Sequence, residues 1–188
     1  ASLSYYLNLF NTIWNDEFTE VREIGKEKWL NHLIDNSDIT NDTLSVVLTI
    51  AKEISIEGRE GKPVGTTFLI GDSRNVLAKS RQIALNPFEG HAPEKRMVTN
   101  LNFKENIKEF AQIDGAFVIS GDGLIEAAGR YITVDTSHVN LPSGMGSRHN
   151  SVAAITNETN AVGIVVSQSG AKISIFKNIS AFELRQMV

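Results

Sequence analysis

The sequence contains no cysteine, which excludes a disulfide framework and zinc or iron–sulfur sites with cysteine ligands. Long hydrophobic runs are missing too: stretches such as residues 161–166 are far too short to span a bilayer, and no signal peptide opens the chain. The sequence also lacks four common motifs: G-x-G-x-x-G after a strand, the P-loop, H-E-x-x-H and G-x-S-x-G. These absences predict a soluble, cytoplasmic protein outside the best-known dinucleotide, P-loop, zinc-protease and α/β-hydrolase classes.

Charge is scarce and unevenly distributed. The net charge is −4, yet residues 1–62 hold 11 acidic and 6 basic side chains, whereas residues 147–188 hold 2 and 4. An acidic N-terminal third is a poor surface for long nucleic acid, which needs a basic stripe. The C-terminal part could receive a small anion such as a nucleotide. With 188 residues, 41% of them hydrophobic, the chain is long enough for one compact domain with its own core.

Apolar residues recur at three- and four-residue steps in the first third of the chain and predict helices near residues 6–14, 29–34 and 44–54. Thr40 or Asn41 would cap the third helix. Glycine, proline and charged residues predict a loop at 57–63. We therefore divide the chain into an N-terminal helical segment, residues 1–62, and a main domain, residues 63–188.

After residue 63 the pattern alternates between strand-like and helix-like segments. Predicted strands are 64–70, 83–85, 116–120, 124–128, 131–134, 161–167 and 172–176, and predicted helices are 103–111, 147–157 and 180–187. The turn 121–123 makes a hairpin of the third and fourth strands. This interleaving predicts an α/β fold in which helices flank a mixed central β-sheet.

Asp114-Gly115-Ala116 stands directly before an apolar strand. Here Gly115 and Ala116 would allow a ligand to come close to the backbone. The Asp114 carboxylate could bind a hard divalent cation or accept a proton from a hydroxyl group. Taken alone, the triplet is more typical of a turn aspartate that caps a strand.

Residues 141–155 form a glycine-rich lead into a predicted helix, with Ser147 as the expected N-cap. A helix N-terminus presents unpaired N–H groups and the positive end of the helix dipole, which suits phosphate. The positive charge of Arg148 in the first turn interacts unfavourably with the positive end of the helix dipole, unless an anion binds there. His149 and Ser151 add hydrogen-bonding groups. The alternative is an ordinary surface helix with a solvated arginine.

Together the two segments resemble the catalytic core of the diadenylate cyclases, the DAC-domain family, with D-G-A followed by an R-H-R-like motif. Ala116 and Arg148 are separated by 31 residues, about the spacing of that family. The flanking sequence at residues 127–128, 141–142, 152–155 and 164–167 also agrees. The resemblance covers about residues 63–178 and is strongest to the archaeal-type members.

The resemblance implies condensation of two ATP molecules into the second messenger cyclic di-AMP, with release of two pyrophosphates. It assigns catalysis to Asp114, Arg148 and His149, and binding of a divalent metal, Mn²⁺ or Mg²⁺, to Asp114. ATP-binding positions under the resemblance are Gly115, Ala116, Val134, Ser147, Arg148, His149, Asn150, Ser151 and Ser167. Because the product is two-fold symmetric and one small domain holds one ATP, we expect a face-to-face homodimer or a higher homo-oligomer.

The sequence departs from the family pattern in three places. Asn150 replaces the last arginine of R-H-R, Gln168 and its neighbour replace an acidic pair, and Ile113 replaces a histidine before D-G-A. These departures motivate an alternative function, a catalytically weak or inactive nucleotide-binding or sensor module of the same fold.

Overall fold

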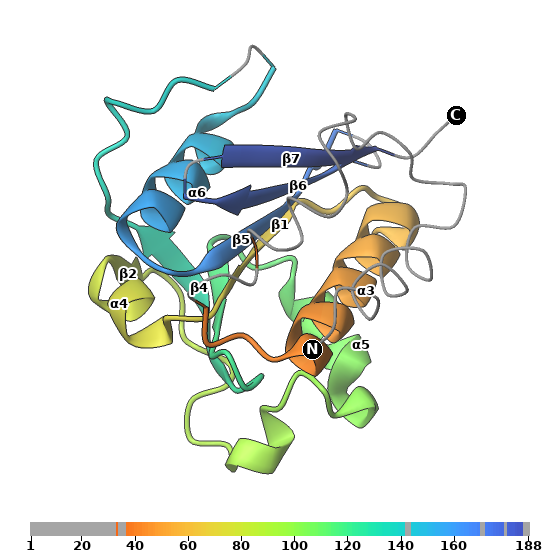
Figure 1. Ribbon diagram of the computed structural model, residues 1–188. Helices are drawn as coiled ribbons and strands as arrows, with labels where there is room; N and C mark the ends of the chain where they lie inside the picture. Colours follow the sequence, from red (N-terminus) through yellow and green to blue (C-terminus); the bar gives the residue numbers. More distant parts are fainter. Residues whose placement is uncertain (1–32, 34–36, 142–143, 170–171, 179, 186–188) are drawn as a thin grey trace.

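The computed structural model describes Leu33 and residues 37–141, 144–169, 172–178 and 180–185. Its centre is a seven-stranded sheet in the order β2-β4-β3-β1-β5-β6-β7 (Figure 1). The strands are β1 (Thr66–Ile70), β2 (Ser80–Gln82), β3 (Ala116–Ile119), β4 (Ile125–Ile132), β5 (Val162–Val166), β6 (Lys172–Lys177) and β7 (Ser180–Arg185). β1 and β3 are parallel, and the other neighbours are antiparallel. The predicted mixed sheet is confirmed.

Helices cover both faces of this sheet. They are α3 (Asn41–Glu57), α4 (Ser73–Ala78), α5 (Lys104–Phe110) and α6 (Ser147–Glu158), with short 3₁₀ turns η1 (Pro93–Lys95) and η2 (Leu101–Phe103). α3 and α5 share one hydrophobic cluster with the sheet, and α4 and α6 share the other (Figure 1). No helix in the described part of the chain is long and apolar enough to cross a membrane.

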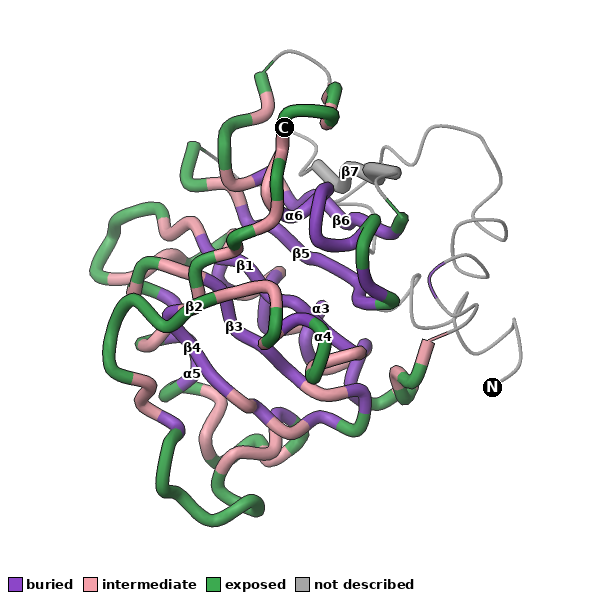
Figure 2. Tube along the Cα trace, turned by 90° about the vertical axis from the view of Figure 1, so that its left-hand side faces the viewer, coloured by how far each residue is buried: buried purple, intermediate pink, exposed green. Residues whose placement is uncertain are grey.

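The central strands are buried on both sides (Figure 2). Because side chains alternate along a strand, Phe68 and Ile70 of β1 join the α3–α5 cluster, whereas Leu69 joins the α4–α6 cluster. Phe117 of β3 stacks on Phe68 with the ring centroids 4.9 Å apart. Apolar runs without polar alternation are therefore what this sheet requires, since neither face meets water.

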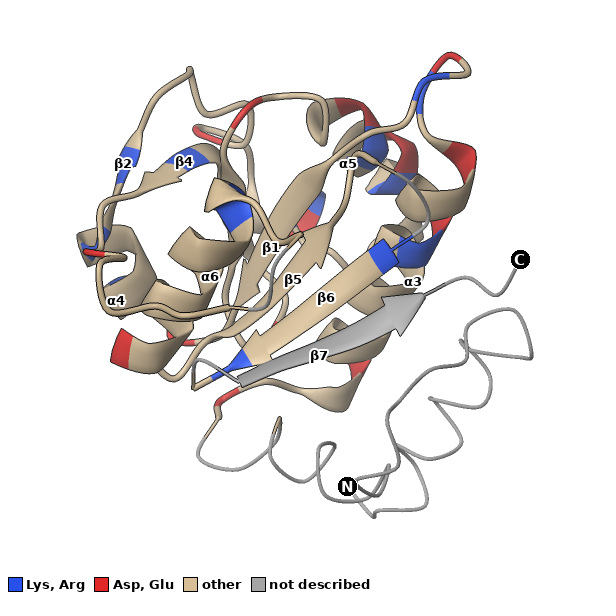
Figure 3. Cartoon of the chain, turned by 90° about the horizontal axis from the view of Figure 1, so that it is seen from above, with Lys and Arg blue, Asp and Glu red and all other residues tan. Residues whose placement is uncertain are grey.

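A charged network joins α3 to α5 at the surface of the molecule, where basic and acidic side chains are interspersed (Figure 3). The Lys108 ammonium lies 2.7 Å from Glu53 and 2.9 Å from Glu57. Burial alone would lower the pKa of Lys108, but its hydrogen bonds to these carboxylates outweigh burial and raise it above the ordinary value. The two helices are thereby held together as one layer.

The N-terminal predictions are confirmed where the structure describes them. α3 occupies the expected third helix, and Thr40 is its N-cap, with its hydroxyl accepting a hydrogen bond from the Thr43 N–H at 3.3 Å. The two earlier helices fall outside the described residues, apart from the buried, helical Leu33. The division of the chain at residue 62 stays a prediction.

Three element predictions are wrong. Residues 180–185 form β7 rather than a helix, because they pair with the free edge of β6 and so satisfy their backbone groups there. The short strand expected at 83–85 lies at β2, residues 80–82, where it pairs with β4. The separate strand expected at 131–134 is the end of the long β4. α4 was not expected at all.

Leu48 tests whether α3 is part of the core. Its side chain is 3% exposed in the α3–α5 cluster, whereas Leu85 is 95% exposed. We expect Leu48→Ala to lower the free energy of unfolding by about 2–5 kcal/mol through lost burial and an incompletely filled cavity. Leu85→Ala should change it by no more than about 0.5 kcal/mol. Urea denaturation measures both, and equal effects would contradict the packing described for α3.

Candidate active site

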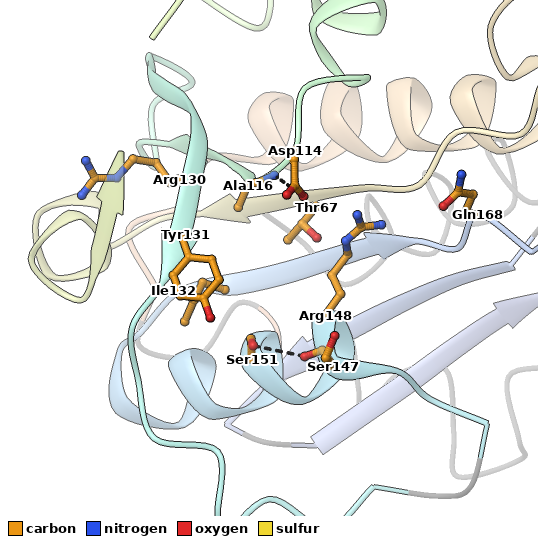
Figure 4. A pocket seen from close by; sticks show the side chains of 11 residues that line it. Thr67, Asp114, Ala116, Arg130, Tyr131, Ile132, Ser147, Arg148, Ser151 and Gln168 are labelled. Carbon is orange, nitrogen blue, oxygen red and sulfur yellow. Dashed lines mark hydrogen bonds between the residues drawn. The ribbon is translucent and has the colours of Figure 1, made fainter. Parts of the chain in front are cut away.

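The pocket of interest lies at one edge of the sheet, where β1 and β3 begin and where β4 and β5 end. The N-terminus of α6 faces the same edge (Figure 4). The volume of the pocket is about 410 Å³, within the range of small-molecule sites. Segments more than 30 residues apart in sequence therefore build one cavity.

Asp114, Gly115 and Ala116 all line this pocket. Asp114 is exposed and accepts a hydrogen bond from the Gly115 N–H through Oδ1 at 3.0 Å, which orients its carboxylate. Thr67 of β1 lies beside it, since β1 pairs in parallel with β3 and sets Thr67 opposite Ala116. Asp114, two residues before β3, and Thr67 of β1 thus lie next to each other in the pocket lining (Figure 4).

α6 supplies three more lining residues, Ser147, Arg148 and Ser151. The N-cap is Gly146 rather than the predicted Ser147, and no side chain caps the helix. Ser147 is instead the first helical residue, and its carbonyl accepts a hydrogen bond from the Ser151 hydroxyl at 3.1 Å. The first turn carries no acidic residue, so its N–H groups and the Arg148 guanidinium make this wall of the pocket electropositive.

His149 does not line the pocket. Its side chain is 9% exposed, and its ring packs edge-on against Phe176 of β6 with centroids 6.1 Å apart. Successive residues of a helix point about 100° apart, so Arg148 can face the cavity while His149 faces the sheet. The catalytic role expected for His149 stays a prediction, and the geometry gives this residue a packing contact.

Three other expected positions lie near the pocket without lining it. Val134 packs against the α4–α6 cluster. Asn150 donates its backbone N–H to the Gly146 carbonyl at 3.2 Å. The Ser167 hydroxyl lies 3.0 Å from that of Ser169. The assignment of these three residues to ATP binding stays a prediction.

Sequence reasoning missed several lining residues: Thr67, Arg130, Tyr131 and Ile132, while Gln168 was noted only as a departure from a family pattern. Tyr131 is 52% exposed, and the Arg81 guanidinium lies 5.1 Å from its ring centroid. A tyrosine exposed within a β-rich run was the available signal. The others are visible only once the strand ends are known to share an edge.

Arg130 has a structural task beside the pocket. Its guanidinium points away from the cavity (Figure 4) and donates hydrogen bonds to the carbonyls of Leu77 at 2.7 Å and Ser80 at 2.6 Å. Burial lowers its pKa. These bonds tie the end of α4 and the start of β2 to β4, and so brace one wall of the site.

Metal-binding capacity in the pocket is small. Among the described residues, no three His, Asp or Glu side chains come together as a metal site, and Asp114 is the one carboxylate found in the described lining. Mg²⁺ in nucleotide enzymes is commonly held by one or two carboxylates together with substrate phosphates. The donor set therefore fits a cation that arrives with a nucleotide, and Asp114 is the side chain that would hold it.

Comparison with known proteins decides the family. The family model DAC, described as "DisA bacterial checkpoint controller nucleotide-binding", matches residues 53–180. The chain belongs to the DAC family. The matched range includes Asp114 and Arg148, and so contains both halves of the pocket.

Two curated relatives of this DAC chain carry the name diadenylate cyclase, and both come from archaea, as the sequence predicts. The protein from Methanocaldococcus jannaschii is 43% identical over 136 residues, which are 72% of this chain and 43% of that protein. The one from Haloferax volcanii is 37% identical over 164 residues, 86% of this chain and 60% of that protein. The chain thus spans less than two thirds of the length of either relative.

A solved structure supports the fold of the DAC chain. The crystal structure of a hypothetical membrane-spanning protein from Bacillus cereus matches with a TM-score of 0.60. The match covers 96% of this chain and 87% of the other, at 12% identity. A likeness at that identity bears on the fold alone.

The backbone around residue 115 requires a glycine. A Cβ there would lie 2.7 Å from the Gly129 carbonyl carbon and 2.8 Å from the Arg130 nitrogen, and φ is +104°. Gly90 has φ of +80° with open space around it. We expect Gly115→Ala to lower the free energy of unfolding by about 2 kcal/mol or more, from strain plus overpacking.

The control is Gly90→Ala, which should show only the strain of a left-handed residue, about 1 kcal/mol. Thermal or urea unfolding measures both variants. A Gly115→Ala protein as stable as the Gly90→Ala protein would refute the close contact between β3 and β4.

Proposed function

We propose that this chain is a diadenylate cyclase, which joins two ATP molecules into cyclic di-AMP and releases two pyrophosphates. The observation that carries the proposal is the meeting of Asp114 and Arg148 in one pocket of a DAC-family chain. A proton acceptor and a phosphate-binding group on opposite walls are what nucleotidyl transfer requires. The proposed catalytic unit is residues 63–188, with residues 1–62 as an N-terminal helical segment.

In each half-reaction the ribose 3′-oxygen of one ATP attacks the α-phosphorus of the other. A new P–O bond forms, the bond from the α-phosphorus to the bridging oxygen breaks, and pyrophosphate leaves with that electron pair. Asp114, which lines the pocket together with Thr67, would accept the hydroxyl proton. A divalent cation, Mg²⁺ or Mn²⁺, held by Asp114 and the phosphates would favour deprotonation of the hydroxyl.

Arg148 and the start of α6 have the complementary role. Negative charge builds up on the α-phosphate and on the departing pyrophosphate during transfer. The guanidinium and the start of α6 line the pocket and would meet this charge. The helix backbone fixes its N–H groups before the substrate binds, so their stabilising effect needs little reorganisation at the moment of reaction.

Two chains are needed for the complete reaction. The product contains two equivalent phosphodiester bonds, whereas a pocket of about 410 Å³ suits one nucleotide and presents one attacking side. A homodimer with its two-fold axis through the product brings two such pockets face to face. Higher homo-oligomers built on this dimer are compatible with the same chemistry.

Asp114→Asn tests the catalytic assignment. Incubated with ATP and Mg²⁺ or Mn²⁺, the unsubstituted chain should form cyclic di-AMP, resolved by chromatography. The variant should form it at least roughly 100-fold more slowly, because the amide cannot accept the proton. Asp122→Asn is the matched control: it makes the same change in the turn of the same hairpin, outside the described lining.

Asp122→Asn should keep its activity, and both variants should remain folded by circular dichroism. Cyclic di-AMP formed at the normal rate by folded Asp114→Asn would refute the assignment. An unsubstituted chain that binds ATP without forming product would instead favour the nucleotide-binding or sensor module.

Mixing Asp114→Asn with unsubstituted chain tests the dimer. If both subunits must attack, only dimers of two unsubstituted chains close both bonds. With random pairing at equal amounts and constant total protein, activity should fall to about one quarter. Independent subunits would retain about one half. Retention of one half, with subunit exchange verified by fluorescence energy transfer, would contradict the face-to-face arrangement.

A further inference from the structure

Gly65, just before β1, has a contact that its own backbone does not explain. Its φ lies outside the left-handed region that favours glycine, unlike that of Gly115. Any residue could therefore adopt its conformation. A Cβ at this position, however, would lie 2.5 Å from Nη1 of Arg148, far inside van der Waals contact. The space that a side chain would take is occupied by the guanidinium.

The rest of that space is bounded by Gln168. The added Cβ would lie 3.0 Å from the Gln168 Cβ and 3.2 Å from its backbone nitrogen. These neighbours would have to yield by only a few tenths of an ångström, whereas the guanidinium would have to move away. Arg148 is the far end of a flexible side chain, so its displacement is the easy response.

Shape, rather than bonding, holds Arg148 in this position. Within the described part of the chain, no hydrogen bond or ion pair holds its guanidinium, and Arg148 lines the pocket, so its donors are available to a ligand. Figure 4 shows the side chain extending from α6 across the cavity, toward the side of Gln168. A planar group without a bonded partner keeps its place through the surfaces it touches.

We propose that Gly65 is a positioning residue: by lacking a Cβ, it leaves room for the Arg148 guanidinium and so sets the affinity of the pocket for nucleotide phosphates. The link to phosphate rests on the proposed function. The positional part does not, because it concerns only the place of Arg148 in the empty pocket. The two parts are tested separately.

The first experiment observes Arg148 directly, without nucleotide. The Nε–Hε signal of Arg148 is assigned by its disappearance in Arg148→Lys. Gly65→Ala should shift this signal while the backbone amide signals of the β3–β4 hairpin stay in place. An unmoved Arg148 signal in Gly65→Ala overturns the proposal, whatever the protein binds.

The second experiment measures binding of 3′-deoxy-ATP with Mg²⁺, a ligand that lacks the attacking hydroxyl, by calorimetry. Arg148→Ala should weaken it roughly tenfold or more, through loss of charged hydrogen bonds. Gly65→Ala should weaken it by a large part of that factor. In the Arg148→Ala background, Gly65→Ala should add less than about a twofold change in affinity. The effects of two substitutions that act on the same guanidinium are not additive.

3′-Deoxyadenosine is the phosphate-free comparison, and Gly65→Ala should leave its affinity unchanged. An equal loss for both ligands, or the same loss with and without Arg148, overturns the proposal, since the methyl group would then act on something other than the guanidinium. If the unsubstituted chain binds neither ligand, the proposed function fails, and the Arg148 signal still decides the position. Should Gly65→Ala not fold, Gly65→Ala/Gln168→Gly removes the contact with the Gln168 Cβ and leaves those with Arg148 and with the backbone nitrogen of residue 168.

Discussion

The pairing of β1 with β3 on one side and with β5 on the other is the constraint on which the site depends. The registers set Thr67 opposite Ala116 and Thr66 opposite Val166. The residues just outside these pairs, Asp114 and Gln168, are therefore brought to one edge of the sheet. A shift of one residue in these registers would exchange the side chains packed in the α3–α5 cluster with those packed in the α4–α6 cluster, so the packing of both faces opposes it.

α6 completes the site through its position and its rotation. Its buried face, which includes His149 against Phe176, sets how the helix is turned on the sheet. Arg148, about 100° further round the helix, then faces the cavity. A cation in the first turn opposes the helix dipole, and the cost is offset when an anion binds between them. Packing of one residue thus directs the chemistry of its neighbour.

Most of the fold could be predicted from local patterns. Apolar spacing located α3, α5 and α6, and buried runs located β1, β3, β5 and β6, because these signals reflect contact with a core. The prediction of a C-terminal helix was wrong because pairing with the edge of β6 determined the conformation of residues 180–185. The β2 and β4 boundaries were displaced for the same reason. Strand ends depend on partners that are distant in sequence.

Within the site, two chemically distinctive segments, Asp114 to Ala116 and Ser147 to Ser151, and the family to which they belong could be recognised without coordinates. Their residue types are unusual enough locally to allow this. Only the tertiary structure decided that Thr67, Tyr131 and Gln168 join them and that His149 turns toward the core. It also decided that two glycines serve different neighbours: Gly115 the backbone of β4, and Gly65 the Arg148 guanidinium. The sequence around a glycine does not reveal why a side chain is excluded there. The reason is the distant atom that occupies the position its Cβ would take.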